Sequence, residues 1–210
     1  APYLKARLSA NKTKGCSPMQ VRFTDISEGS ITSRTWQRNG ITVSNTTNPQ
    51  IQFINTTNQP IYDTITLIIR NGGPGTCADT AMQIITTYPE VDATFTHAVT
   101  DGCNPLTVNF IHTPAQIIPV NYYWEFGDEG LSNLASPQHI FINELETAQT
   151  YEVKLLVESP QGCKDSVYSQ VEVASRLKAN FTLPNSAGCS PFTANFTDVS
   201  EGDIATRHWY

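Results

Sequence analysis

The chain has 210 residues, of which 13 are basic and 19 acidic, and its formal net charge at pH 7 is -6. Because no basic cluster interrupts this acidic balance, we expect no nucleic acid partner and no polybasic contact with a membrane surface. No apolar run approaches the roughly 18 residues of a membrane span and no signal peptide is recognisable, so we expect no direct membrane insertion and a fragment of an exported protein.

One phrase occurs three times along the chain. It reads Gly-Cys-Ser-Pro or Gly-Cys-Asn-Pro and begins at Gly15, Gly102 and Gly188, so the copies are offset by 87 and 86 residues. This offset is too long for a solenoid repeat and close to the length of a small domain, which indicates tandem modules. The expected modules are residues 1–88, residues 89–174 and, as the N-terminal part of a third, residues 175–210.

The first copy carries Trp36 after the repeated phrase, and Trp124 and Trp209 follow the phrase at corresponding places in the other copies. Shortly after Trp36 comes the pair Asn39-Gly40, which is suited to a tight type I′ turn between two strands. Nowhere do apolar residues recur at helical spacing over three turns. The sequence therefore predicts an all-β fold.

The second copy gives the clearest strand signals. Tyr151, Val153, Leu155 and Val157 alternate with mostly polar residues, a period of two that buries one face of a sheet. Further β-branched or aromatic runs lie at residues 106–112, 122–126, 139–142 and 167–173. About seven short strands with one tryptophan and a cysteine pair are typical of an immunoglobulin-like β-sandwich.

A motif in the second copy sharpens this interpretation. It consists of Trp124, Glu125, Phe126, Gly127 and Asp128. Together with Ser-Pro-Gln-His-Ile-Phe at residues 136–141 and Tyr-Glu-Val at residues 151–153, it resembles the PKD (polycystic-kidney-disease) repeat. The resemblance implies a seven-stranded sandwich of the kind that serves as a spacer or binding module in secreted bacterial hydrolases and cell-surface adhesins. The first copy departs from the motif at residues 36–40 and is better described as PKD-like or generally immunoglobulin-like.

Five cysteines occupy equivalent places in the copies. Cys77 lies 61 residues after Cys16, and Cys163 lies 60 residues after Cys103. This spacing predicts one disulfide per module, Cys16 to Cys77 and Cys103 to Cys163, and hence an oxidising compartment. Cys189 is then left without a partner in this segment.

Candidate chemical groups all have a structural alternative. Glu125, Asp128 and Glu129 form either a carboxylate cluster for acid-base work or calcium, or a turn in which Asp128 accepts backbone N–H groups; the resemblance favours the turn. The histidines lack zinc spacing; they are His97, His112, His139 and His208. There is no nucleophile elbow, no metalloprotease motif and no phosphate-binding loop, so we expect no enzyme activity, no metal and no cofactor.

Two further patterns concern the surface. Asp79-Thr80-Ala81 and Asp165-Ser166-Val167 resemble the O-glycan acceptor of bacteria that use type IX secretion, although a turn preference explains them equally. Residues 23–36 and 196–209 agree at nine of fourteen positions, including a Ser-Glu-Gly run and an arginine. Recent duplication is the favoured reason, and a shared interaction loop is the alternative.

These patterns lead to a functional hypothesis. We expect a non-catalytic extracellular segment of a large bacterial surface adhesin, which acts as a semi-rigid stalk or spacer and could also serve as a binding surface. The resemblance extends to gliding-motility adhesins. The expected partners are adjoining repeats of the same chain, surface polysaccharide or other cell-envelope proteins. The alternative is an accessory array on a secreted polysaccharide- or protein-degrading enzyme, which exposed aromatic residues would favour. The candidates for such residues are Tyr122, Tyr123 and Tyr168.

Overall fold

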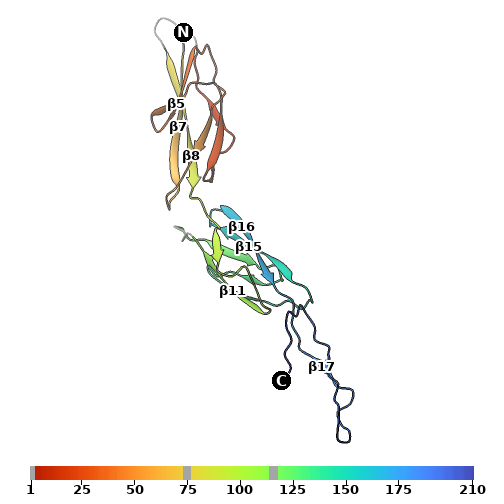
Figure 1. The fold of residues 1–210 in the computed structure, drawn as a ribbon. Coiled ribbons are helices and arrows are strands. Elements are labelled where there is room, and N and C mark those ends of the chain that lie inside the picture. Colours follow the sequence, from red (N-terminus) through yellow and green to blue (C-terminus); the bar gives the residue numbers. More distant parts are fainter. Residues whose placement is uncertain (1–2, 73–76, 114–117) are drawn as a thin grey trace. The chain divides into compact units, whose positions relative to one another are not determined.

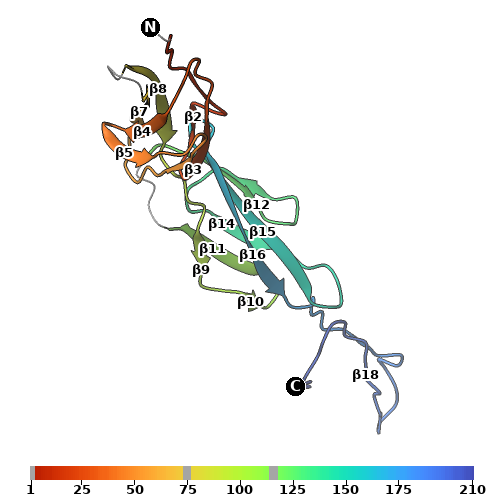
Figure 2. The ribbon, with the colours of Figure 1, turned by 90° about the horizontal axis from the view of Figure 1, so that it is seen from above.

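The structure is a computed structural model that describes residues 3–72, 77–113 and 118–210. Within these residues every regular element is a strand, as Figures 1 and 2 show. The chain divides into two compact units. The first unit contains the first sequence copy and also Glu158–Lys164. The second unit contains most of the second copy, and its last segment, Asp165–Tyr210, runs on through the third copy.

The first copy forms two sheets. A three-stranded sheet has the order β1-β3-β6, and a five-stranded sheet has the order β2-β8-β7-β4-β5. Their strands are β1 (Leu8–Ala10), β2 (Lys14–Cys16), β3 (Met19–Asp25), β4 (Ser33–Arg38), β5 (Ile41–Ser44), β6 (Gln50–Phe53), β7 (Ile61–Arg70) and β8 (Ala78–Tyr88). The core takes alternate residues from both sheets, so the sheets pack face to face as a β-sandwich. The largest buried side chains of this core are Met19, Phe23, Trp36, Phe53, Ile65, Leu67, Ile69 and Ile85.

The Asn39-Gly40 pair connects β4 to β5 in the expected way. Both residues have positive φ, 51° at Asn39 and 83° at Gly40, and the two strands pair in antiparallel register on either side. Positive φ at both central residues defines the type I′ hairpin turn. The turn prediction is therefore confirmed.

The second copy repeats this arrangement. Its three-stranded sheet has the order β14-β11-β9 and its five-stranded sheet the order β10-β16-β15-β12-β13. The strands are β9 (Phe95–His97), β10 (Asp101–Gly102), β11 (Leu106–His112), β12 (Asn121–Glu125), β13 (Leu131–Ser132), β14 (Gln138–Phe141), β15 (Gln149–Glu158) and β16 (Lys164–Val173). Val153, Leu155 and Val157 are fully buried, so the period of two in β15 faces the core as predicted.

The third copy contributes two short strands, β17 (Phe181–Thr182) and β18 (Thr197–Asp198). Phe181, Phe196 and Trp209 contact one another with ring centroids 5.7 to 5.8 Å apart. Each of these side chains is more than half exposed. The equivalent Phe23 and Trp36 of the first copy also touch, at 5.7 Å, but are buried beneath two complete sheets.

Candidate functional site

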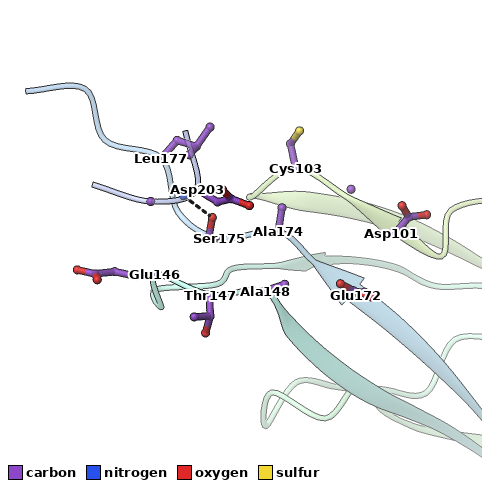
Figure 3. A pocket seen from close by; sticks show the side chains of 12 residues that line it. Asp101, Cys103, Glu146, Thr147, Ala148, Glu172, Ala174, Ser175, Leu177 and Asp203 are labelled. Atoms are coloured by element: carbon purple, nitrogen blue, oxygen red, sulfur yellow. Dashed lines mark hydrogen bonds between the residues drawn. The ribbon is translucent and has the colours of Figure 1, made fainter. Parts of the chain in front are cut away.

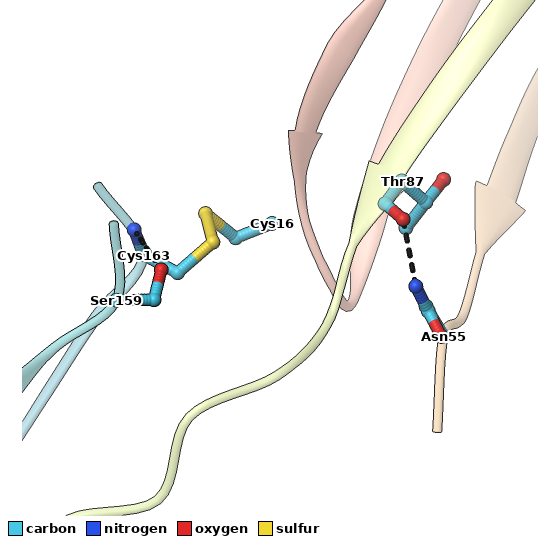
Figure 4. The surroundings of a disulfide bond; sticks show 5 residues. All are labelled: Cys16, Asn55, Thr87, Ser159 and Cys163. Atoms are coloured by element: carbon cyan, nitrogen blue, oxygen red, sulfur yellow. Dashed lines mark hydrogen bonds between the residues drawn. A yellow bond between two sulfur atoms is a disulfide. The ribbon is translucent and has the colours of Figure 1, made fainter. Parts of the chain in front are cut away.

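The cysteine pairing differs from the prediction. Cys16 is bonded to Cys163, with the Cα atoms 5.6 Å apart and a sequence separation of 147 residues (Figure 4). Cys16 belongs to the first sequence copy and Cys163 to the second. The predicted Cys16–Cys77 and Cys103–Cys163 bonds, one within each module, are therefore wrong.

Strand length explains why a bond within one copy cannot form. Cys16 pairs with Tyr88 at the end of β8, whereas Cys77 immediately precedes the start of that 11-residue strand. Such a strand is roughly 36 Å long at the usual rise, and a disulfide needs Cα atoms within about 7 Å. The same argument separates Cys103, beside the end of β16, from Cys163, at its start. The two cysteines of each copy lie at opposite ends of one strand.

Cys77 and Cys163 occupy the same turn in their respective copies. The backbone N–H of Cys77 donates to Asn71 Oδ1 at 2.9 Å, and that of Cys163 donates to Ser159 Oγ at 3.1 Å. The backbone N–H of Asn71 or Ser159 in turn donates to the carbonyl of the cysteine. This hydrogen-bonded turn presents the cysteine at the end of the sandwich where the last strand begins.

The opposite end of each sandwich, which we call the cysteine pole, carries the Gly-Cys phrase beside a buried asparagine. In the first copy the side-chain amide of Asn55 donates to the carbonyl of Gln59 at 2.8 Å. It also donates to the carbonyl of Thr87 at 2.7 Å, as Figure 4 shows. In the second copy that of Asn143 donates to Thr147 O at 2.8 Å and to Val173 O at 3.1 Å. These asparagines tie the last strand to the loop behind it and fix the pole.

The residue after the cysteine completes this frame. Ser17 Oγ accepts the backbone N–H of Asn55 at 3.0 Å, and Asn104 Oδ1 accepts that of Asn143 at 2.9 Å. The glycine before the cysteine is closely packed, because a Cβ there would lie 2.7 Å from Met19 Sδ in the first copy and 2.6 Å from Leu106 Cδ1 in the second, and these side chains would have to shift. Sequence reasoning missed the asparagines, although their matching places in the two copies were a usable signal.

The run shared by the first and third copies is explained by contacts within each copy. Asp25 Oδ1 accepts the backbone N–H of Ser27 at 2.9 Å, and Oδ2 is paired with Arg34 Nε. Burial opposes ionisation of Asp25, but hydrogen bonds from Ser27 and Arg34 outweigh it and hold the pKa of this carboxyl below its usual value. Asp198, Ser200 and Arg207 repeat the network in the third copy. The charged residues of the run therefore serve the local fold.

The glycine of this run also has a structural reason. Gly29 has a φ of 109°, and a Cβ on it would lie 2.2 Å from the carbonyl oxygen of Tyr3. Gly202 has a φ of 103° and lies equally close to the carbonyl of Arg176. The loop thus packs directly onto the segment that leads into its own copy, where only glycine fits.

The Trp124–Asp128 motif forms a turn supported by an aromatic stack. Asp128 Oδ1 accepts the backbone N–H of Gly130 at 3.0 Å, and Oδ2 lies 2.7 Å from His139 Nε2. The His139 ring stacks on Phe126 with centroids 4.0 Å apart. Glu125 lies on the surface with Lys154 at 3.3 Å. Asp128 and His139 thus hold the turn against the sandwich.

A family model described as the PKD domain matches residues 86–174. Residues 86–174 form a PKD domain. Its Trp-Glu-Phe-Gly-Asp turn and its stacked His139 are the residues through which the sequence resembled that family. The first copy has Arg38 and Asn39 at the corresponding turn, and both donate to the buried carboxylate of Asp63, at 2.6 to 2.8 Å. The ion pair with Asp63 thus supports the turn of the first copy, whereas Asp128 and His139 support the turn of the PKD domain.

Comparison with solved structures gives distant likenesses only. The fibronectin(III)-like modules of CbhA from Clostridium thermocellum are 7% identical, with 80% of this chain and 93% of that chain covered and a TM-score of 0.36. The amphioxus IgVJ-C2 molecule is 12% identical, with 75% and 98% covered and a TM-score of 0.35. No curated protein matches the chain.

Most other candidate residues have structural partners. His97 bonds the carbonyl of Val99 and Ser169 Oγ, at 2.7 and 2.8 Å, and His112 Nε2 lies 2.7 Å from the carbonyl of Asp92. His208 stacks against Tyr210. Among the described residues, no group of three or more His, Cys, Asp or Glu side chains is arranged to hold a metal ion. In the same part of the chain, no helix is long and apolar enough to cross a membrane.

The aspartates of the Asp-Thr-Ala and Asp-Ser-Val patterns secure the start of each copy. Asp79 Oδ2 accepts the backbone N–H of Ala6 at 2.7 Å, and Asp165 Oδ2 accepts that of Ala93 at 2.9 Å. Hydrogen bonds from the backbone N–H groups of Ala6 and Thr80 lower the pKa of Asp79. A structural role thus accounts for the repeated aspartate.

The aromatic candidates for substrate contact lie on the five-stranded sheet of the PKD domain. Tyr123 and Tyr168 are 44% and 54% exposed, and Lys154 lies over the Tyr168 ring at 6.0 Å. Tyr122 instead packs edge-on against His112, 5.1 Å away between centroids. Two of the three tyrosines are therefore available at the surface.

Proposed function

We propose that this chain is a non-catalytic segment of a large bacterial surface adhesin, in which tandem copies of the sandwich form a semi-rigid stalk outside the cell. The observation that carries the proposal is the Cys16–Cys163 bond, which joins the first sequence copy to the second. A disulfide of this kind persists in an oxidising, extracellular compartment. The PKD domain at residues 86–174 supports the same setting.

The bond also changes how the chain carries tension. A force applied at the two ends passes from Cys16 through the sulfur atoms to Cys163, whose sequence separation is 147, so the stretch of chain between them bears no load. Most strands of both copies lie inside this shielded stretch. A stalk that holds a cell against a surface benefits, because the strands inside the loop are not extended when it is pulled. Adjoining repeats are then its immediate partners, with surface polysaccharide or envelope proteins as the expected target, and gliding motility as one setting.

Single-molecule stretching of the chain, held at its two ends, tests this load path. Full extension of the oxidised chain should be shorter than that of the reduced chain by about 530 Å, because 147 residues at about 3.6 Å each stay within the closed loop. A Cys163→Ser variant should extend like the reduced chain, whereas Cys103→Ser should behave like the oxidised wild type. Equal extension before and after reduction would contradict the stalk mechanism. A catalytic domain encoded in the same reading frame would favour the accessory array of a secreted enzyme instead.

A further inference from the structure

Cys103 occupies the place in the second copy that Cys16 occupies in the first. β2 runs parallel to β8 with Lys14 opposite Thr86, and β10 runs parallel to β16 with Asp101 opposite Glu172. In both copies a buried asparagine and the residue after the cysteine frame the pole. The Cys103 thiol is exposed and is not in a disulfide. The same frame that presents a bonded cysteine in the first copy therefore presents a free one in the second.

A pocket of about 830 Å³ lies beside Cys103, lined by the pole of the second copy and by the start of the third (Figure 3). The backbone N–H of Asp203 donates to Ser175 Oγ at 3.2 Å, which brings the start of the third copy to this pocket. Four carboxylates belong to its lining, namely Asp101, Glu146, Glu172 and Asp203.

The pole of the first copy is different in charge. The paired registers place Lys14 and Thr86 where the second copy has Asp101 and Glu172. The turn bonded at this first pole, Glu158–Lys164, groups with the first copy in one compact unit. An acidic pocket, in contrast, attracts a turn that carries basic residues.

We propose that this pocket receives the cysteine-bearing turn of a further copy of the sandwich, flanked by basic residues, and that Cys103 forms a disulfide with its cysteine. The turn is the counterpart of Glu158–Lys164, and the bond repeats the Cys16–Cys163 rule one copy later. The inference uses the tandem arrangement of the proposed function but not its mechanical role. Bonds of this kind would link each copy to the next along an array.

The bond forms by thiol-disulfide exchange with an oxidoreductase of the export compartment in its disulfide form. The Cys103 thiolate attacks one sulfur of the donor disulfide and releases one donor thiolate. The thiolate of the incoming turn then attacks the Cys103 sulfur of the mixed disulfide and releases the second. The protons of the two cysteine thiols end on the donor, which is reduced to a dithiol while the two cysteines are oxidised.

The test offers the intact, non-reduced chain a peptide of sequence Lys-Ser-Pro-Gln-Gly-Cys-Lys, activated as a 2-pyridyl disulfide. The comparison peptide has the same sequence except that glutamate replaces both lysines. Peptide mapping measures the rate of addition at Cys103 and at Cys189. Cys189 is also exposed and lies in the corresponding Gly-Cys-Ser-Pro phrase, but it is not among the residues that line the pocket. We expect the turn peptide to modify Cys103 about tenfold faster than the glutamate peptide, with no comparable preference at Cys189.

A pocket-filling variant separates docking from thiol reactivity. Ala148→Trp should abolish the preference at Cys103, whereas Ala135→Trp at an exposed site outside the pocket should keep it. Methyl 2-pyridyl disulfide, a small neutral reagent, should react with Cys103 at the same rate in all three chains. Equal rates for the two peptides, or a preference that survives Ala148→Trp, would overturn the proposal. Such a result would leave the stretching experiment untouched, because that experiment depends on Cys16–Cys163 alone.

Discussion

Replacing Asn143 with alanine should loosen the cysteine pole of the second copy. The side chain is only 1% exposed, and its Oδ1 accepts the backbone N–H of Leu145 at 2.9 Å. Its amide nitrogen lies 2.8 to 3.1 Å from the carbonyls of Thr147, Val173 and Ala174. The amide has two hydrogens, so the side chain makes about three full hydrogen bonds. At about 1 kcal/mol each, Asn143→Ala should cost about 3 kcal/mol of local stability.

Native-state hydrogen exchange measures this loss copy by copy. A cost of about 3 kcal/mol raises the equilibrium constant for local opening, and with it the exchange rate, roughly 100-fold. The effect should be seen in a peptide that contains β16 and Ala174, whose backbone N–H donates to Gly102 O at 2.8 Å. Exchange in β3 of the first copy should stay unchanged. Asn55→Ala should give the mirror-image result, and Asn133→Ala, at an exposed site, should change neither.

The hydrogen-bond argument fails under two outcomes. One is exchange of the β16 peptide in Asn143→Ala that stays within about threefold of the wild type, since that leaves less than about 1 kcal/mol for three contacts. The other is equal acceleration in β3 and β16, because it would place Asn143 in a network common to both copies.

Two further predictions concern the first copy. The Asp63 side chain is 2% exposed and is paired with Arg38 at 2.6 Å. Arg38→Met should therefore lower the local stability of β7, measured by hydrogen exchange, by about 3 kcal/mol, because it leaves a buried carboxylate without its cationic partner. The double variant Arg38→Met with Asp63→Leu should recover most of this stability, because it also removes the carboxylate. An unrecovered double variant would contradict this. The folded-state pKa of Asp79 is lowered, so ionised Asp79 stabilises the folded state. This contribution to stability is present above the unfolded pKa of about 4 and is lost as the pH falls through the folded pKa. Asp79→Asn should thus lower stability at pH 7 and flatten the decline below about pH 4 in acid unfolding, and an unchanged acid limb would speak against the Ala6 contact.

The strands were predictable because their signal is local. The alternation in β15 and the Asn39-Gly40 pair each specify backbone geometry within a few residues, and both occur in the structure as expected. The buried asparagines were not predictable in this way, since a polar residue in a loop usually faces water. Asn55 and Asn143 become buried only when carbonyls from distant strands converge on them.

The charged run shared by the first and third copies shows a second limit. Duplication and a binding loop were both reasonable explanations of the nine matching positions, because neither Arg34 nor Gly29 belongs to an apolar core. The structure gives Arg34 a carboxylate partner, and it places a backbone carbonyl oxygen 2.2 Å from where a Cβ of residue 29 would lie, which is too close for any side chain. Matching polar residues in two copies are therefore explained by a shared hydrogen-bond network, and a shared ligand is not needed to account for them.

The cysteine pairing could not be obtained from spacing alone. In a tandem repeat, a bond within one copy and a bond to the next copy use the same two places in the module, so both rules fit the offsets equally well. Strand register separates them, because Cys16 lies opposite Tyr88 at one end of β8 and Cys77 precedes the other end. A cysteine at the end of the last strand and a cysteine before its start can meet only when they belong to different copies. The two cysteine places that cannot bond within one sandwich therefore link one sequence copy to another. The same rule predicts that Cys103, whose thiol is free, bonds to the cysteine of a further copy.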